Sequence, residues 1–253
     1  MTAMPPANNA MMNIDKKDAN EIRALLIDID DTLVRFKTQD PQDDRNSPNT
    51  GSLAEVLQRA GVELAGLTAE ETARRIARIK REVSWWHWSD FIVELGLRPK
   101  AFWDFAYAVE SAYLEPTGDE ILPALLRLKE HGILLYITSN NPSSGILHKL
   151  RLAGVAHVNG TTLFSQLLGG TELQAMKWEP IYWKKVLAHI ALDAGEVAVV
   201  GDNPRDDYEV PHSIGIRRFF LIDRFRNLSA SDTGTLTHVQ NFNQIADQLL
   251  RKR

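Results

Sequence analysis

The sequence predicts an α/β fold in which helices cover both faces of a parallel sheet. Short runs that are apolar throughout recur along the chain, and segments with helical periodicity alternate with them from about residue 117 to the end. The stretch 37–115 differs, because it contains several helical patterns and no strand pattern. We therefore expect a Rossmann-like three-layer sandwich with a helical domain inserted after the first strand.

The predicted domains follow from these patterns. Residues 21–36 and 116–253 form the α/β core, and residues 37–115 form the helical insertion. The segments 35–37 and 115–118 are the expected hinges between them. Residues 1–20 have scattered charges and no apolar segment, so we expect a disordered tail and no signal peptide.

The predicted strands are uninterrupted apolar runs, as expected for strands that are buried on both faces. A further strand is expected around Leu163 and Phe164. The main runs lie at residues 24–27, 133–137, 197–200 and 218–222.

The predicted helices carry apolar residues at helical spacing. Gly132 is positioned to end the first helix of the core, and Thr68 and Glu71 have the spacing of a capping box. The core helices are expected at residues 120–131, 143–153 and 179–190. Those of the insertion are expected at residues 53–60, 68–83, 89–95 and 101–113.

The composition excludes several classes of protein. The net charge of −4 provides no basic surface for nucleic acid, so no nucleic-acid partner is expected. The absence of cysteine rules out disulfides, thiolate nucleophiles and cysteine-ligated zinc, and it is consistent with a cytoplasmic location. No apolar run approaches the length of a membrane span.

Acidic residues follow two of the predicted strands. Asp28 and Asp30 come directly after the first run, and Asp202 and Asp207 follow the run 197–200. Because the carboxyl ends of parallel strands share one edge of a sheet, these carboxylates should converge there. Their repulsion would be relieved by a divalent cation, and oxygen ligands favour Mg²⁺. The alternative is that these acids merely cap the following helices.

Two other segments could bind an anion. Thr138, Ser139, Asn140 and Asn141 lie between a predicted strand and a predicted helix, where hydroxyls and backbone N–H groups can hold a phosphate. An ordinary helix cap would have the same composition. Lys177 precedes a helix and could serve as a phosphate partner, although a single loop lysine is usually solvated.

Four sequence motifs occur in order after these strands. They read I-D-I-D-D-T-L at 27–33, L-Y-I-T-S-N at 135–140, K-W-E-P-I-Y at 177–182 and G-D-N-P-R-D-D at 201–207. Together they resemble the motifs of the haloacid dehalogenase (HAD) superfamily, although K-W-E-P replaces the commoner K-P. The resemblance covers both ends of the chain but not the insertion, which lies where the family has its C1-type cap domain.

The resemblance implies a catalytic role for each acid. Asp28 would attack phosphorus and form an aspartyl-phosphate, and Asp30 would act as general acid and then as general base. Mg²⁺ would be held by the Asp28 carboxylate, the Asp30 backbone carbonyl and Asp202, with Asp207 helping directly or through water. Dehalogenases of the family lack the second Asp of the first motif, so its presence favours phosphorus chemistry.

The resemblance also implies which groups bind the phosphoryl oxygens. Thr138 is the first choice for the hydroxyl of the second motif and Ser139 the second, with Asn140 beside them. Lys177 would offset the charge between nucleophile and phosphate.

The implied function is hydrolysis of a small phosphate monoester. A phosphosugar mutase of the β-phosphoglucomutase type shares every motif, and a non-catalytic binding protein on the same scaffold is a further alternative. D-I-D-D also matches the motif of protonating terpene cyclases, but those proteins are long and all-helical. The sequence identifies neither the substrate nor the oligomeric state.

The insertion contains an aromatic cluster. Trp85, Trp86 and Trp88 lie close together, with Phe102 and Trp103 further along the chain. They could form a wall for a base or sugar, but packing of a small helical domain is the interpretation we favour.

Overall fold

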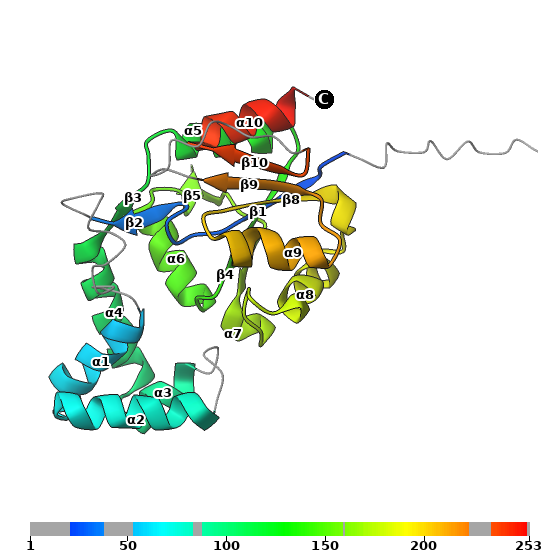
Figure 1. Ribbon diagram of the computed structural model, residues 1–253. Coiled ribbons are helices and arrows are strands. Elements are labelled where there is room, and N and C mark those ends of the chain that lie inside the picture. Colours follow the sequence, from blue (N-terminus) through cyan, green and yellow to red (C-terminus); the bar gives the residue numbers. More distant parts are fainter. Residues whose placement is uncertain (1–20, 38–52, 83–87, 159, 223–233, 252–253) are drawn as a thin grey trace, which may run out of the picture.

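The computed structural model describes residues 21–37, 53–82, 88–158, 160–222 and 234–251. Its centre is a six-stranded parallel sheet with strand order β10-β9-β8-β1-β4-β7 (Figure 1). The strands are β1 (Ala24–Ile27), β4 (Leu134–Ser139), β7 (Gln166–Gly169), β8 (Val197–Gly201), β9 (Arg218–Ile222) and β10 (Leu236–Val239). The central strands β1, β4 and β8 carry the predicted apolar runs.

Two hydrophobic cores cover the two faces of this sheet. Leu25 and Ile27 of β1 face one core, and Ala24 and Leu26 face the other. The first core is completed by α5 (Ile121–Glu130), α6 (Ser143–Leu152) and α10 (Phe242–Leu250). The second is completed by α7 (Gly170–Leu173), α8 (Pro180–Ile190) and α9 (Val210–Ser213). In the described part of the chain, no helix is both long and apolar enough to cross a membrane.

Four helices form a separate group between the first two strands of the sheet in sequence (Figure 1). They are α1 (Leu53–Glu63), α2 (Ala69–Glu82), α3 (Trp88–Glu94) and α4 (Pro99–Tyr113). They enclose a third hydrophobic core that includes Val56, Ile76, Phe91 and Phe102. The Glu71 backbone N–H donates to Thr68 Oγ1 at 3.1 Å, as half of the expected capping box requires.

An antiparallel strand pair lies at the base of this helical cap. Strands β2 (Val34–Phe36) and β3 (Leu114–Pro116) pair with Arg35 opposite Glu115, and Arg35 Nε donates to Glu115 Oε1 at 2.9 Å. The pair occupies the expected hinges and was not predicted as strand. Helix α4 joins it directly and forms the stem of the cap.

Most predicted elements are confirmed, but the strand expected at Leu163 and Phe164 is wrong. Both side chains are buried in the first core, whereas the nearby strand of the sheet starts at Gln166. Their apolar character reflects packing of a connecting segment. Two further features have no counterpart among the predicted elements: β10, and the small hairpin of β5 (His157–Val158) and β6 (Thr161–Thr162).

Candidate active site

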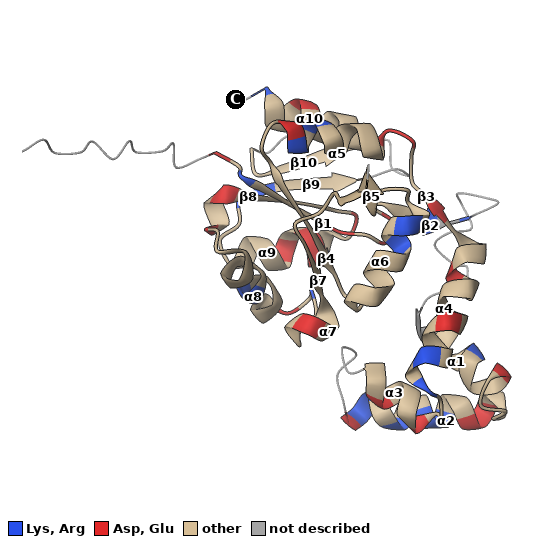
Figure 2. Ribbon diagram, turned by 180° about the vertical axis from the view of Figure 1, so that it is seen from behind, with Lys and Arg blue, Asp and Glu red and all other residues tan. Residues whose placement is uncertain are grey.

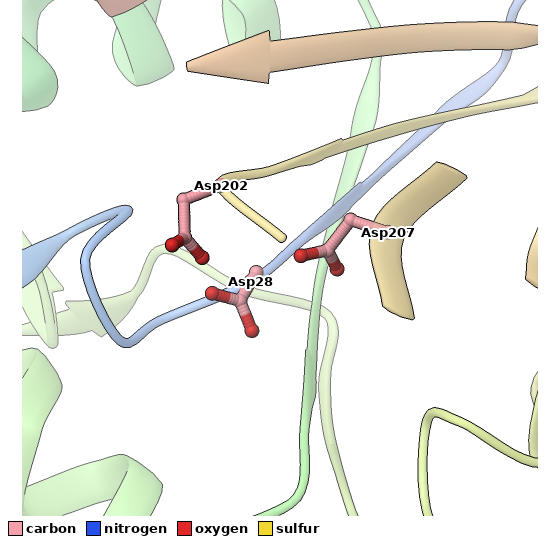
Figure 3. Close-up of side chains that lie close together, drawn as sticks. All are labelled: Asp28, Asp202 and Asp207. Atoms are coloured by element: carbon pink, nitrogen blue, oxygen red, sulfur yellow. The ribbon is translucent and has the colours of Figure 1, made fainter. Parts of the chain in front are cut away.

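Three carboxyl groups converge at the carboxyl edge of the sheet (Figure 3). Asp28 follows β1, Asp202 follows β8, and Asp207 lies in a π-helical turn at Arg205–Glu209. One oxygen from each carboxylate lies within 4.8 Å of the others. The expected convergence is therefore seen for Asp28, Asp202 and Asp207, whereas Asp30, which was also expected there, is not part of this group.

The backbone around β8 allows this close approach. The Asp28 N–H donates to the Val200 carbonyl at 2.9 Å, which continues the β1–β8 ladder into the site. At Gly201, a Cβ atom would collide with the carboxyl group of Asp207. Glycine is thus needed there because Asp207 folds back over the end of the strand.

Lys177 lies between two of the three carboxylates. Its ammonium donates to Asp28 Oδ1, and Nζ lies 2.5 Å from Asp207 Oδ1. The lysine side chain is buried, in contrast to an ordinary loop lysine. The Trp183 indole fixes the loop by donating to the Lys177 carbonyl at 2.9 Å.

Burial raises the pKa of Asp28 to about 7, because the effects of Asp207 and Asp30 add to desolvation and Lys177 opposes it only in part. Burial and the charges of Asp28 and Asp207 raise the pKa of Asp202 to about 9. Burial also raises the pKa of Asp207 against the effect of Lys177. The pKa of Lys177 is raised, because its two carboxylate partners outweigh its own desolvation.

These shifts indicate that the three carboxylates, of which Asp28 and Asp207 are buried and Asp202 is half-buried, have too little positive charge beside them. One lysine leaves the cluster negative, and each oxygen is a ligand of the type that Mg²⁺ prefers. The residues present therefore fit a divalent cation.

Asp30 belongs to a neighbouring network. Asn141 Nδ2 donates to Asp30 Oδ2 at 2.6 Å, and Lys149 Nζ donates to Asp30 Oδ1 at 2.5 Å. Lys149 lies outside the four motifs and is not among the residues predicted for the site. A signal was available, because Lys149 lies three residues after Ile146 and next to Leu150 on the buried stripe of α6.

The residues of the second motif have different environments. Ser139 Oγ accepts hydrogen bonds from the Asn141 backbone at 3.1 Å and from its amide at 3.0 Å. Thr138 is fully buried, and its Oγ1 has no hydrogen-bond partner among the described residues. Asn140 Oδ1 accepts from the Lys177 backbone N–H at 2.7 Å, so its side chain orients the lysine loop.

The described members of the aromatic cluster, Trp88, Phe102 and Trp103, pack inside the cap. Trp88 is buried in the cap core with its ring centroid 6.0 Å from that of Phe91. Phe102 is fully buried and Trp103 packs against the same core, as the packing interpretation expected. Residues 85 and 86 lie outside the described part of the chain.

The chain matches the family of haloacid dehalogenase-like hydrolases over residues 22–215, and it belongs to that family. The resemblance inferred from the four motifs is therefore confirmed.

Two curated relatives are phosphoglycolate phosphatases. The protein from Pasteurella multocida (strain Pm70) is 30% identical over 111 residues, which cover 44% of this chain and 47% of the relative. The protein from Mannheimia succiniciproducens is 28% identical over 116 residues, which cover 46% of this chain and 49% of the relative. The chain thus spans about half the length of the curated relatives it matches.

Solved structures share the fold over nearly the whole chain. A HAD phosphatase from Thermococcus onnurineus has a TM-score of 0.57 at 23% identity and covers 90% of this chain and 98% of its own. A 2-haloacid dehalogenase from Pseudomonas syringae pv. Tomato has a TM-score of 0.60 at 18% identity. The match covers 92% of this chain and 100% of the dehalogenase. Both likenesses concern the fold.

Proposed function

We propose that the protein is a magnesium-dependent phosphatase that hydrolyses a small phosphate monoester through an aspartyl-phosphate on Asp28. The observation that carries this proposal is the position of the Asp28 carboxylate. It accepts a hydrogen bond from the Lys177 ammonium and lies close to the carboxylates of Asp202 and Asp207, at the edge of the sheet where ligands of parallel α/β proteins bind.

In this mechanism Asp28 attacks phosphorus and displaces the alcohol of the ester. Thr32 Oγ1 donates to Asp28 Oδ2 at 3.0 Å, and Lys177 donates to Oδ1, so the carboxylate is oriented before substrate binds. The lysine also offsets the negative charge that accumulates between Asp28 and the phosphoryl group.

Asp30 is the proposed general acid and base. It protonates the leaving oxygen and then takes a proton from the water that hydrolyses the aspartyl-phosphate. Its carboxyl group lies apart from the Asp28 cluster and is 43% exposed, so it can reach a bound ester. A haloacid dehalogenase needs no such acid, and Asp30 therefore supports phosphorus chemistry.

The proposed ligands of Mg²⁺ are the side chains of Asp28, Asp202 and Asp207 and the backbone carbonyl of Asp30. A bound ion would supply positive charge to the phosphoryl oxygens. The raised pKa values of these three carboxyl groups support this assignment, because a cation would favour their ionised forms.

Lys177 and a hydroxyl group of the second motif are the proposed ligands of the phosphoryl oxygens. Between its two hydroxyls we favour Ser139, because Asn141 links Ser139 to Asp30 by hydrogen bonds to both. Thr138, the first choice from sequence, is as buried as Ser139, but its hydroxyl makes no hydrogen bond among the described residues and has no such link to Asp30. Asn140 is assigned two roles: its side chain orients the loop that carries Lys177, and it lies beside the phosphate.

Substrate choice is assigned to the cap, residues 37–115, because every motif residue lies outside it. Both curated relatives are phosphoglycolate phosphatases, so phosphoglycolate is the first substrate to test. A small-molecule ester is the proposed partner, and the absence of cysteine agrees with a cytoplasmic enzyme.

A panel of phosphate esters tests the proposal. Phosphoglycolate, sugar phosphates, nucleotides and an aryl phosphate are incubated with wild-type protein and with Asp28→Asn, with and without Mg²⁺. Free phosphate should appear only with wild-type protein and Mg²⁺. Isomerised sugar phosphate with little free phosphate would favour a mutase, and wild-type-like release by the variant would remove Asp28 from the mechanism. Binding of an ester without turnover would favour a non-catalytic protein.

A further inference from the structure

A buried lysine connects the stem of the cap to the candidate active site. Lys149 of α6 has a side chain that is 7% exposed, and its Nζ lies 2.5 Å from Asp30 Oδ1. The same ammonium lies 3.6 Å from Glu110 Oε1 on α4. Figure 2 shows the end of α4 nearest the core beside α6. One cation thus joins an acid of the site to a residue of the cap.

The side chains around Lys149 suit a positively charged ammonium group. Its ammonium is faced by the carboxylates of Asp30 and Glu110 and by Asn141 Oδ1 at 3.4 Å. Glu110 is only 3% exposed, and its other neighbour is His148 Nε2 at 3.7 Å from Oε2. A carboxylate so deeply buried needs a cation, because an unpaired buried charge is strongly destabilising.

Both oxygens of Asp30 are held by donors from the core. Lys149 binds Oδ1 and Asn141 binds Oδ2, so the orientation of the carboxyl group is defined on both sides. A general acid must point at the leaving oxygen of the substrate, and small misplacement lowers its efficiency.

Glu110 lies three residues before the end of α4, where the chain returns to the core through β3. Stacking of Tyr107 on His148, with ring centroids 4.5 Å apart, holds the same part of α4 against α6. The contact from Glu110 to Lys149 therefore depends on how the cap stem sits on the core.

We infer that Lys149 is a positioning residue for Asp30, and that Glu110 anchors Lys149 to the cap stem so that the orientation of Asp30 depends on the docking of the cap. The inference rests on the proposed function. Lys149 itself contacts no reacting atom and acts only through Asp30.

The first test compares Lys149→Met with Lys149→Arg, with the exposed Lys184→Met as a matched control. For an alkyl phosphate, Lys149→Met should lower kcat by about 100-fold with little change in KM. This loss is at the lower end of the rate enhancement that a general acid provides. An aryl phosphate with a good leaving group should lose far less in single-turnover phosphorylation. Lys149→Arg should recover much of kcat, because arginine keeps the charge. Equal losses for both esters would overturn the inference.

A second test separates positioning from stability. Lys149→Met leaves Glu110 without its cation, whereas the double variant Lys149→Met/Glu110→Gln removes both charges. The double variant should regain melting temperature but not kcat for the alkyl phosphate. Recovery of kcat together with stability would show that Lys149 is only structural. Glu110→Gln alone should lower kcat by about tenfold, which corresponds to about 1.4 kcal/mol of activation free energy. The loss is smaller than for Lys149→Met because Lys149 still binds Asp30.

A double-mutant cycle tests whether Lys149 acts through Asp30. Adding Lys149→Met to Asp30→Asn should cause no further loss of kcat, and an additive loss would overturn the inference. An active wild-type protein with a wild-type-like Lys149→Met variant would overturn only this inference. A wild-type protein that releases no phosphate from any ester would overturn the proposed function and the inference with it.

Discussion

The side-chain oxygen of Asn140 accepts a hydrogen bond from the backbone N–H of Lys177 at 2.7 Å. This contact ties the end of β4 to the loop before α8, although the two residues are 37 positions apart. The second and third motifs therefore form one unit, in which an amide places an ammonium beside Asp28.

Asn140→Ala should misplace that ammonium. We expect kcat to fall by about 100-fold, because displacement of a catalytic group by about 1 Å can have that effect. Loss of the hydrogen bond should lower the free energy of unfolding by only about 1 kcal/mol. Steady-state kinetics and urea unfolding measure the two effects, with the exposed Asn243→Ala as control. Proportional loss of activity and stability would contradict the positional role.

Asp28→Asn should separate activity from stability. Turnover should fall on the order of 10⁴-fold or more, as for other catalytic nucleophiles. Because burial raises the pKa of Asp28 to about 7, its carboxyl group is ionised above that pH in the metal-free protein, and the buried charge destabilises the fold there. An uncharged amide should raise the melting temperature at alkaline pH on the order of 2–4 °C, which corresponds to about 1 kcal/mol. A lower melting temperature in EDTA would contradict this explanation.

Stabilisation by Mg²⁺ should increase with pH. The ordinary carboxyl pKa is 3.8, whereas burial raises that of Asp28 to about 7 and that of Asp202 to about 9. The folded metal-free protein therefore binds more protons than the unfolded chain across this range, and its stability falls as pH rises. Mg²⁺ binds the ionised carboxylates and should oppose this loss. Melting temperatures with and without Mg²⁺ should differ little near pH 5 and strongly near pH 8; a constant difference would argue against the carboxylate site.

Conservative substitutions can distinguish the roles of the two hydroxyl groups of the second motif. Ser139→Ala should raise KM and lower kcat together, by about 10-fold each, because a hydrogen bond to a charged phosphoryl oxygen contributes about 1.5–3 kcal/mol. Thr138→Val should be nearly neutral, since valine keeps the shape of a side chain whose hydroxyl has no partner in the described structure. The reverse pattern would return the role to Thr138.

Trp88→Ala should destabilise the cap. The side chain is buried in the cap core, so truncation should cost about 3–5 kcal/mol of unfolding free energy. All substrates should lose activity together, in proportion to unfolding. Val93→Ala in the same helix is the control, because Val93 is 65% exposed and should change stability by less than about 0.5 kcal/mol. A selective loss for one substrate at constant melting temperature would place Trp88 in the substrate pocket.

The carboxylate cluster could be predicted because a local sequence pattern identifies its members. Asp28 and Asp202 each follow an apolar run, and adjacent parallel strands bring such residues together whatever their separation in sequence. Lys177 was found only by its motif. Its burial between Asp28 and Asp207 depends on a loop whose path no local pattern encodes.

Other features depend on contacts that local patterns do not specify. Strands β2 and β3 have three residues each, too few for an alternating pattern, and they form because the two ends of the cap meet. The Glu110–Lys149 contact joins helix α4 of the cap to helix α6 beside the sheet. The buried stripe of α6 indicated that Lys149 needs a partner, but the partner could be identified only in three dimensions.

The β2–β3 pair has a consequence for how such proteins diversify. The chain leaves the core and re-enters it on neighbouring strands, with Val34 opposite Pro116 and Phe36 opposite Leu114. Adjacent strands lie about 4.8 Å apart, so an insertion replaced by another module with closely spaced ends would leave the sheet unchanged. With the proposed division of roles between cap and core, recombination at this junction would exchange the selectivity without rebuilding the chemistry, and chimeras between relatives are best joined there.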